Sequence, residues 1–279
     1  MLEAQHITHQ IARKILLDDV SLAVRPGELV AVVGANGAGK STLLKTFSRE
    51  LTPTKGQVVL GNKPINRFSA LELARQRAVL AQQNPLAFEF TVYELVMMGR
   101  YPHFEGHPRP EDMSIVDFAL ERTGITQLAG RSVPTLSGGE QQRVHLAKVL
   151  AQLMTSDEIQ QPHASIRQAK YLLLDEPTTG LDLYYQHSLL DVASELTRRG
   201  YGVVAILHDL NLVMQYADKV LLLKEGRALA FGKPISVLTT DAIFSAFHLS
   251  VQILHQPELD YPLIIHNRQT VPVPASTHL

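Results

Sequence analysis

The chain of 279 residues contains no cysteine and no tryptophan. The absence of cysteine excludes disulfide bonds, thiolate catalysis and cysteine-ligated metal sites, and it is compatible with a reducing compartment. The net charge is −1 and the basic residues are scattered, so no nucleic-acid partner is predicted. No apolar run approaches the roughly 18 residues that cross a bilayer, and the first residues lack the apolar stretch of a signal peptide. We therefore expect a soluble chain that meets a membrane only through a partner.

Short apolar runs alternate with helix-like segments. The runs Leu29–Val33, Tyr171–Leu174 and Val203–Leu207 are typical of strands covered on both faces. The segments Lys40–Arg49 and Tyr184–Arg199 have the pattern of helices, and a glycine closes the second. This alternation predicts an α/β fold with a mainly parallel sheet, in which ligands bind beyond the carboxyl ends of the strands.

Shorter strand-like segments precede and follow the first helix. Residues 2–8, 15–24 and 57–65 predict an antiparallel β layer that flanks the parallel sheet. The polar stretch 155–169 resembles a surface loop, and residues 268–279 resemble a frayed tail.

The predicted organisation is one nucleotide-binding domain over residues 1–240 and a C-terminal extension over residues 241–279. Within the domain we expect a catalytic core, residues 1–85 and 165–240, and an inserted, mostly helical subdomain, residues 86–164. Prolines and histidines interrupt the helical pattern of this insertion at residues 101–110.

A phosphate-binding pattern, G-x-x-x-x-G-K-[ST], lies directly after the first strand and before a helix. It consists of Gly34, Ala35, Asn36, Gly37, Ala38, Gly39, Lys40 and Ser41. The small residues let backbone N–H groups surround a phosphate, and the following helix adds its positive end. Lys40 would contact the β- and γ-phosphates, Ser41 would offer a hydroxyl to Mg²⁺, and Thr42 could reach the α-phosphate.

Acidic residues end the second apolar strand. Asp175 at the strand tip can hold Mg²⁺, usually through water, and Glu176 can orient and deprotonate an attacking water. His208 follows the strand Val203–Leu207, which brings it to the same edge of a parallel sheet, where it could contact the γ-phosphate. Asp175 and Glu176 could also be solvated loop charges, and His208 could be a structural histidine. Together with the phosphate loop they predict hydrolysis of a nucleotide.

The tetrapeptide Ser137-Gly138-Gly139-Glu140 begins a further predicted helix. Ser137 and Glu140 have the spacing of a capping box, which starts many ordinary helices. Two glycines directly after the cap cost helix propensity, so they indicate that something approaches the backbone closely.

Leu136–Gln141 resembles the signature motif of ATP-binding cassette proteins. Five further features follow that family's order, namely the phosphate loop (P-loop), Gln82 after an apolar strand, a Walker B motif at 171–176, Thr179–Asp182 as the D-loop, and His208 as the switch histidine. The resemblance implies a P-loop ATPase fold that takes ATP and Mg²⁺.

The resemblance also implies roles for residues outside the P-loop. Ser137, Gly138 and Gly139 would bind the γ-phosphate of an ATP seated on a second copy of the chain. Gln82 would contact Mg²⁺ and the attacking water, and Asp182 would line the dimer interface. The sequence departs from the family at residues 9–13, where many members have an aromatic residue that stacks on adenine and this chain has none. We therefore expect weak selectivity for the base.

Within the family, a single cassette without a membrane span resembles the ATPase of an importer. Met97–His103 resembles the ATPases of iron-siderophore, heme and cobalamin importers, although it could also be a plain helix stop before proline. Glu140–Leu153 and Leu207–Leu212 resemble the heme branch most. This implies two permease copies contacted around residues 84–105, a periplasmic heme-binding protein as an indirect partner, and a peripheral location at the cytoplasmic face of the inner membrane. A siderophore or cobalamin importer, or a regulatory or DNA-transaction cassette, remains an alternative.

Overall fold

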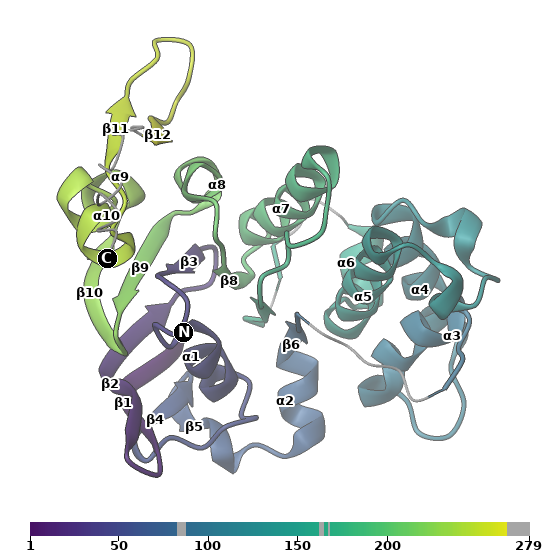
Figure 1. The fold of residues 1–279 in the computed structure, drawn as a ribbon. Coiled ribbons are helices and arrows are strands. Elements are labelled where there is room, and N and C mark those ends of the chain that lie inside the picture. The colour runs from purple at the N-terminus through teal and green to yellow at the C-terminus, as the bar shows by residue number, and fades with distance from the viewer. Residues whose placement is uncertain (83–87, 162–164, 167, 267–279) are drawn as a thin grey trace, which may run out of the picture.

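A six-stranded, mainly parallel sheet forms the centre of the molecule (Figure 1). The computed structural model describes residues 1–82, 88–161, 165–166 and 168–266. The strands lie in the order β10-β9-β3-β8-β7-β6, with β10 antiparallel to β9 and the other pairs parallel. Their bounds are Leu29–Val33 (β3), Arg77–Leu80 (β6), Tyr171–Leu174 (β7), Gly202–Ile206 (β8), Lys219–Lys224 (β9) and Arg227–Gly232 (β10). The three predicted buried strands are confirmed as β3, β7 and β8.

A second, antiparallel sheet of four strands flanks the first, as predicted. Its order is β2-β1-β4-β5, and its strands are Leu2–Ile11 (β1), Lys14–Val24 (β2), Lys55–Leu60 (β4) and Lys63–Pro64 (β5). The helix α1 (Lys40–Phe47) contacts both sheets. Phe47 of α1 is fully buried in an apolar cluster with side chains of β1, β2, β3 and β8, so this helix is fixed from both sides.

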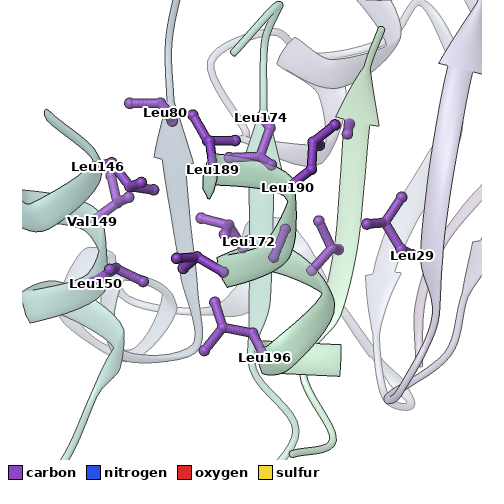
Figure 2. Close-up of a cluster of buried hydrophobic side chains, with 14 of the residues drawn as sticks. Leu29, Leu80, Leu146, Val149, Leu150, Leu172, Leu174, Leu189, Leu190 and Leu196 are labelled. Carbon is purple, nitrogen blue, oxygen red and sulfur yellow. The ribbon is translucent and has the colours of Figure 1, made fainter. Parts of the chain in front are cut away.

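The strand β3 is buried on both faces because alternate side chains enter two different cores. Val30 and Val32 belong to the cluster around α1. Leu29, Ala31 and Val33 belong to a larger cluster on the other face, which includes helices α5 and α7. Figure 2 shows part of this second cluster, in which leucines of β3, β6 and β7 meet leucines of α5 and α7. The continuous apolar run in the sequence is thus explained by coverage on both sides.

Helices dominate the segment between β6 and β7. They are α3 (Val92–Met97), η2 (Met98–His103), α4 (Pro110–Arg122), η3 (Thr126–Leu128), η4 (Val133–Thr135), α5 (Gly138–Leu153) and α6 (Ser156–Gln160), while η1 (Ile65–Arg67) and α2 (Ala70–Gln76) precede β6. Figure 1 shows α3 to α6 gathered beyond the β6 edge of the central sheet, away from α1. The predicted helical character of this region is confirmed from residue 92 onward, and residues 86–87 lie outside the described part.

The prediction of a surface loop over residues 155–169 is wrong for its first part. Residues 156–160 form α6, which Thr155 begins with a capping box to Glu158. The Glu158 carboxylate is buried and paired with Lys170 at 2.7 Å. A helix of 5 residues is too short to give a periodic signal, and its stability comes from this buried pair. Residues 162–164 and 167 lie outside the described part of the chain.

The last described elements contribute side chains to the larger apolar cluster on one face of the central sheet. They include α7 (Leu183–Arg198), α8 (Leu210–Tyr216), α9 (Pro234–Val237), α10 (Thr240–Phe247), β11 (Val251–Leu254) and β12 (Leu263–His266). The side chain of Asn211 in α8 exchanges two hydrogen bonds with the backbone of Ile264, at 2.7 and 3.2 Å, which holds the β11–β12 hairpin on α8. The predicted tail at 268–279 lies outside the described residues. Among the described helices, none combines the length and apolarity needed to cross a membrane.

Candidate functional site

The P-loop connects β3 to α1 at the carboxyl edge of the central sheet. Gly39, at the start of α1, has a φ of 102°, and a Cβ on it would lie 2.7 Å from the Leu16 carbonyl oxygen. A Cβ on Gly34 would lie 2.4 Å from the Leu223 carbonyl oxygen. Both positions therefore require glycine, because the backbones of β2 and β9 approach too closely for any side chain.

The helix α1 begins without a side-chain cap. Its first N–H groups are consequently not occupied by the side chain of an N-cap residue and can be donated to an anion. Ala35, Asn36 and Gly37 in the middle of the loop are exposed, whereas Gly34 and Ala38 at its ends are buried. The loop thus presents backbone at its tip and is anchored at both ends. Thr42 lies in the first turn of α1.

Lys40 and Ser41 are both held by the loop's own surroundings. The ammonium of Lys40 donates to the carbonyls of Gly34 and Ala35 at 2.8 and 3.1 Å. Burial lowers the pKa of Lys40, and the nearby carboxylates of Glu176 and Asp175 oppose this shift. A buried ammonium whose hydrogen bonds go to carbonyl oxygens is well placed to exchange them for an anion.

Asp175 lies at the end of β7, as predicted, and accepts a hydrogen bond from the Ser41 hydroxyl at 3.2 Å. Burial raises the pKa of Asp175, the bond from Ser41 lowers it, and the neighbouring Glu176 raises it again. A buried carboxylate beside a hydroxyl is an oxygen donor set that suits Mg²⁺, and a cation there would favour the charged carboxylate. Among the described residues, no cluster of three or more His, Cys, Asp or Glu that could hold a metal occurs.

Glu176 is held between two side chains that come from different strands. Gln82, after β6, donates its amide to one carboxylate oxygen at 2.8 Å, and His208, after β8, contacts the other at 2.8 Å. Glu176 has a φ of 50°, a left-handed conformation that costs a non-glycine residue roughly 1–3 kcal/mol. Strain of this kind persists where the surroundings hold a side chain in one direction.

The topology explains why these residues meet. The strands β6, β7, β8 and β3 are parallel neighbours, so their carboxyl ends form one edge. Gln82, Asp175, Glu176, His208 and the P-loop follow those four ends. All the residues that were predicted from strand positions are thus gathered at this edge.

The residues of the signature motif lie elsewhere. Ser137 caps α5, accepting from the N–H of Glu140 at 3.4 Å, while the Glu140 carboxylate accepts from the N–H of Ser137 at 2.8 Å. The predicted capping box is therefore confirmed. Ser137 and Gly138 are exposed and Gly139 is half-buried. Figure 1 shows α5 beyond β6 and well separated from α1, so the chain does not bring its own signature motif to its own P-loop.

Side chains near the start of α5 connect it to the segment after Glu176, which the sequence did not predict. Gln142 donates to the carbonyl of Pro177 at 3.3 Å, and the guanidinium of Arg143 lies 4.1 Å from the ring centre of Tyr185 in α7. Asp182 caps α7 by accepting from the N–H of Tyr185 at 3.0 Å. The glutamine after the signature motif was a possible signal, but its partner is 35 residues away in the chain.

The tip of the β1–β2 hairpin carries no aromatic ring, in keeping with the departure noted in the sequence. Ile11 and Ile15 there are 57% and 50% exposed. An adenine at this hairpin would find aliphatic side chains in place of an aromatic platform.

The fold and the residues at the sheet edge define a P-loop protein built to bind a nucleoside triphosphate. The model of the ABC transporter family matches residues 17–159. The hemin import ATP-binding protein HmuV of Gloeobacter violaceus is 49% identical over 95% of this chain and 94% of its own length. The HmuV protein of Deinococcus radiodurans is 44% identical over 93% and 94%. The chain belongs to the ABC transporter family, as one of its ATPase subunits.

Solved structures agree with this assignment. A metal-chelate type ABC transporter in an inward-facing conformation has a TM-score of 0.78 at 25% identity and covers 96% of this chain and 98% of the other. The dimeric cassette MJ0796 has a TM-score of 0.71 at 26% identity and covers 84% and 99%. The predicted fold class, a P-loop α/β core with an antiparallel layer and a helical insertion, is confirmed.

Proposed function

We propose that this chain hydrolyses ATP to drive the uptake of hemin through a separate membrane permease. The relatives named hemin import ATP-binding protein support this cargo, because the two described above match at 49% and 44% identity over nearly the whole chain. The observation that carries the chemistry is Glu176, held between Gln82 and His208 beside the P-loop.

In the proposed reaction, a water oxygen attacks the γ-phosphorus of ATP and the bond to the β–γ bridging oxygen breaks, giving ADP and inorganic phosphate. Glu176 orients the water and takes its proton. Gln82 holds the Glu176 carboxylate and contacts the water, and His208 stabilises the charge that spreads over the γ-phosphate. Lys40 and the backbone from Gly34 to Ser41 bind the phosphates.

Ser41, Asp175 and Gln82 are the proposed residues for Mg²⁺. Their hydroxyl, carboxylate and amide oxygens are hard donors of the kind this ion prefers. The ion, when bound, neutralises charge on the β- and γ-phosphates. Asp175 orients Ser41 through their hydrogen bond, which directs the hydroxyl toward the residue after β7.

The second copy of the chain is the proposed partner that completes each site. Dimeric ABC cassettes are known among the matching structures, including a post-hydrolysis state bound to ADP and phosphate. The exposed start of α5 has free N–H groups and the positive end of a 16-residue helix, which suits the γ-phosphate of an ATP seated on the partner's P-loop. Asp182, close to this helix start, would line the interface.

The permease contact is proposed around residues 84–105, of which 84–87 lie outside the described residues. The described part presents Phe88 and Tyr101, which are 74% and 58% exposed. Exposed aromatic side chains of this kind are typical of a protein interface. Attachment to the permease would place the chain at the cytoplasmic face of the inner membrane, with a periplasmic heme-binding protein as the indirect partner.

The test is purification of the chain with the permease encoded beside it, reconstitution in lipid, and measurement of ATP hydrolysis with hemin, a ferric siderophore or cobalamin. We expect stimulation by hemin, and loss of most turnover in the Glu176→Gln variant. Stimulation by cobalamin or the siderophore alone would overturn the hemin assignment. A chain that associates with no permease and binds DNA would overturn transport altogether.

A further inference from the structure

Three basic side chains from outside α5 close its C-terminus. Helices leave their last carbonyls without intrahelical partners, and cations are favoured at that negative end. Here four consecutive carbonyls, those of residues 151–154, accept from the basic side chains. The contacts are Arg100 Nη1 to Ala151 O (2.5 Å) and to Met154 O (2.8 Å), His103 Nε2 to Gln152 O (2.7 Å), and Lys170 Nζ to Leu153 O (2.6 Å). We call Arg100, His103 and Lys170 the α5 clamp.

Arg100 is the most constrained member of the α5 clamp. It is 4% exposed, and its Nε donates to the carboxylate of Asp112 at 2.9 Å. The other oxygen of Asp112 accepts from the N–H of Arg109 at 2.9 Å, at the start of α4. Because a buried charge is costly unless its partners are fixed, these contacts hold η2, α4 and α5 in one arrangement.

The backbone of η2 also lies directly against α5. A Cβ on Gly99 would be 2.3 Å from the carbonyl oxygen of Lys148 and 3.2 Å from the N–H nitrogen of Gln152. Glycine at this position is needed for the close approach rather than for an unusual φ. The contact leaves no space in which η2 could slide along α5 without moving the helix.

Lys170 connects the same helix end to the catalytic strand. It pairs with the buried Glu158, and it directly precedes β7, the strand that ends at Asp175 and Glu176. Glu158 also accepts from the Tyr201 hydroxyl at 3.0 Å. The C-terminus of α5 is therefore held between η2 on one side and the start of β7 on the other.

The two ends of α5 differ in their surroundings. Its N-terminus is the exposed Ser137-Gly138-Gly139 start, and its C-terminus is the clamped end about 24 Å away, at 1.5 Å per residue over 16 residues. A helix packed along its length moves as a rigid body, so a displacement at one end is felt at the other.

We propose that Arg100 is a positioning residue that locks η2 onto the C-terminus of α5, so that movement of η2 reorients the helix start that contacts ATP on the second copy. The inference rests on the proposed function, which supplies the permease contact at η2 and the ATP contact at Ser137. Arg100 is too buried to offer a surface to ATP or to the permease. It acts through α5.

The coupling is tested in the reverse direction, because coupling between two sites is reciprocal. The chain has no cysteine, so Tyr101→Cys in η2 gives a single attachment point for an environment-sensitive fluorophore. In a Glu176→Gln background, Mg·ATP should produce a dimer and shift the emission of the label. We expect Arg100→Gln to retain ATP binding and dimer formation but to lose the emission shift.

Arg122→Gln is the matched control, since Arg122 lies in the same helical region and pairs with Glu195 of α7 instead of α5. It should keep the full shift. Gly99→Ala is the second variant, which separates η2 from α5 without removing a buried charge, and it decides the question if Arg100→Gln does not fold. The inference is overturned if Arg100→Gln or Gly99→Ala shows the same emission shift as the labelled chain with Arg100 and Gly99 intact. A labelled chain that neither binds Mg·ATP nor dimerises overturns the proposed function instead.

Discussion

The helices α1 and α5 both have glycine and serine at their starts, yet the two starts differ in how they could bind phosphate. The start of α1 has no side-chain cap, and its lysine and serine are held by groups of the same chain. The start of α5 has a complete capping box, and of the two glycines behind it Gly138 is exposed and Gly139 is half-buried. In the proposed function, the first is a site that one copy builds alone, whereas the second would be half of a site that a second copy completes.

The difference follows from where each helix stands in the fold. α1 follows β3 in the middle of the parallel sheet, where the ends of β6, β7 and β8 bring further polar side chains beside it. α5 stands beyond the edge strand β6, and the segment that reaches its start is the one after β7, at Pro177 and Leu181, and not the P-loop. In the proposed function, a second molecule would carry the ligand to a helix start in that position.

The largest expected effect comes from Glu176→Gln, which keeps both helix starts and removes the proton acceptor. Hydrolysis should fall by about 10²- to 10⁴-fold, the usual contribution of a general base. ATP binding should persist, and the dimer should be trapped. Turnover is measured by phosphate release and the dimer by size-exclusion chromatography with Mg·ATP. Glu225→Gln, a second glutamate with positive φ, is the control. Unchanged hydrolysis in Glu176→Gln would remove this residue from its role.

Lys40→Ala should weaken ATP binding at the start of α1. Loss of a charge-assisted hydrogen bond is worth about 1.5–3 kcal/mol, so the single chain should bind ATP roughly 10- to 150-fold more weakly. The dissociation constant of a fluorescent ATP analogue is the measurement. Lys45→Ala, an exposed lysine in the last turn of the same helix, should bind normally. An unaltered dissociation constant in Lys40→Ala would contradict the phosphate site.

Much of the α1 side could be predicted from the sequence because it depends on neighbours in the chain. The runs of β3 and β7, the glycines of the P-loop and the acids after β7 are all local patterns, and parallel topology then brings the strand ends together. The contacts around Glu176 needed the structure, since Gln82 is 94 residues away from it. The same holds for α6 and its buried Glu158, whose polar sequence resembles a loop until Lys170 is placed against it.

A buried histidine in α5, His145, should make the stability of the protein depend on pH, and α1 contains no histidine. Burial lowers the pKa of His145 from 6.5 to about 4. As the pH falls, the unfolded chain therefore takes up this proton before the folded chain does, and the contribution of His145 to stability is lost between those two values. Between pH 7 and pH 5 the free energy of unfolding should fall by about 2 kcal/mol from this group. The free energy of unfolding is measured by urea denaturation at the two pH values. His145→Leu should reduce the difference between them, whereas His107→Gln, at an exposed position, should leave the difference unchanged.

Ser137→Ala gives the smallest effect and the sharpest comparison, because α3 has the same capping box at Thr91 and Glu94. Removing either cap should cost about 1 kcal/mol of stability. Only Ser137→Ala should also slow hydrolysis, by roughly fivefold for a loss of that size, since its helix start serves the partner's ATP. Nucleotide affinity of the single chain should be normal in both variants, because neither cap lies at the P-loop. If Thr91→Ala slows hydrolysis as much as Ser137→Ala, the α5 start is a stabilising cap alone, and the second half of the site must be sought elsewhere.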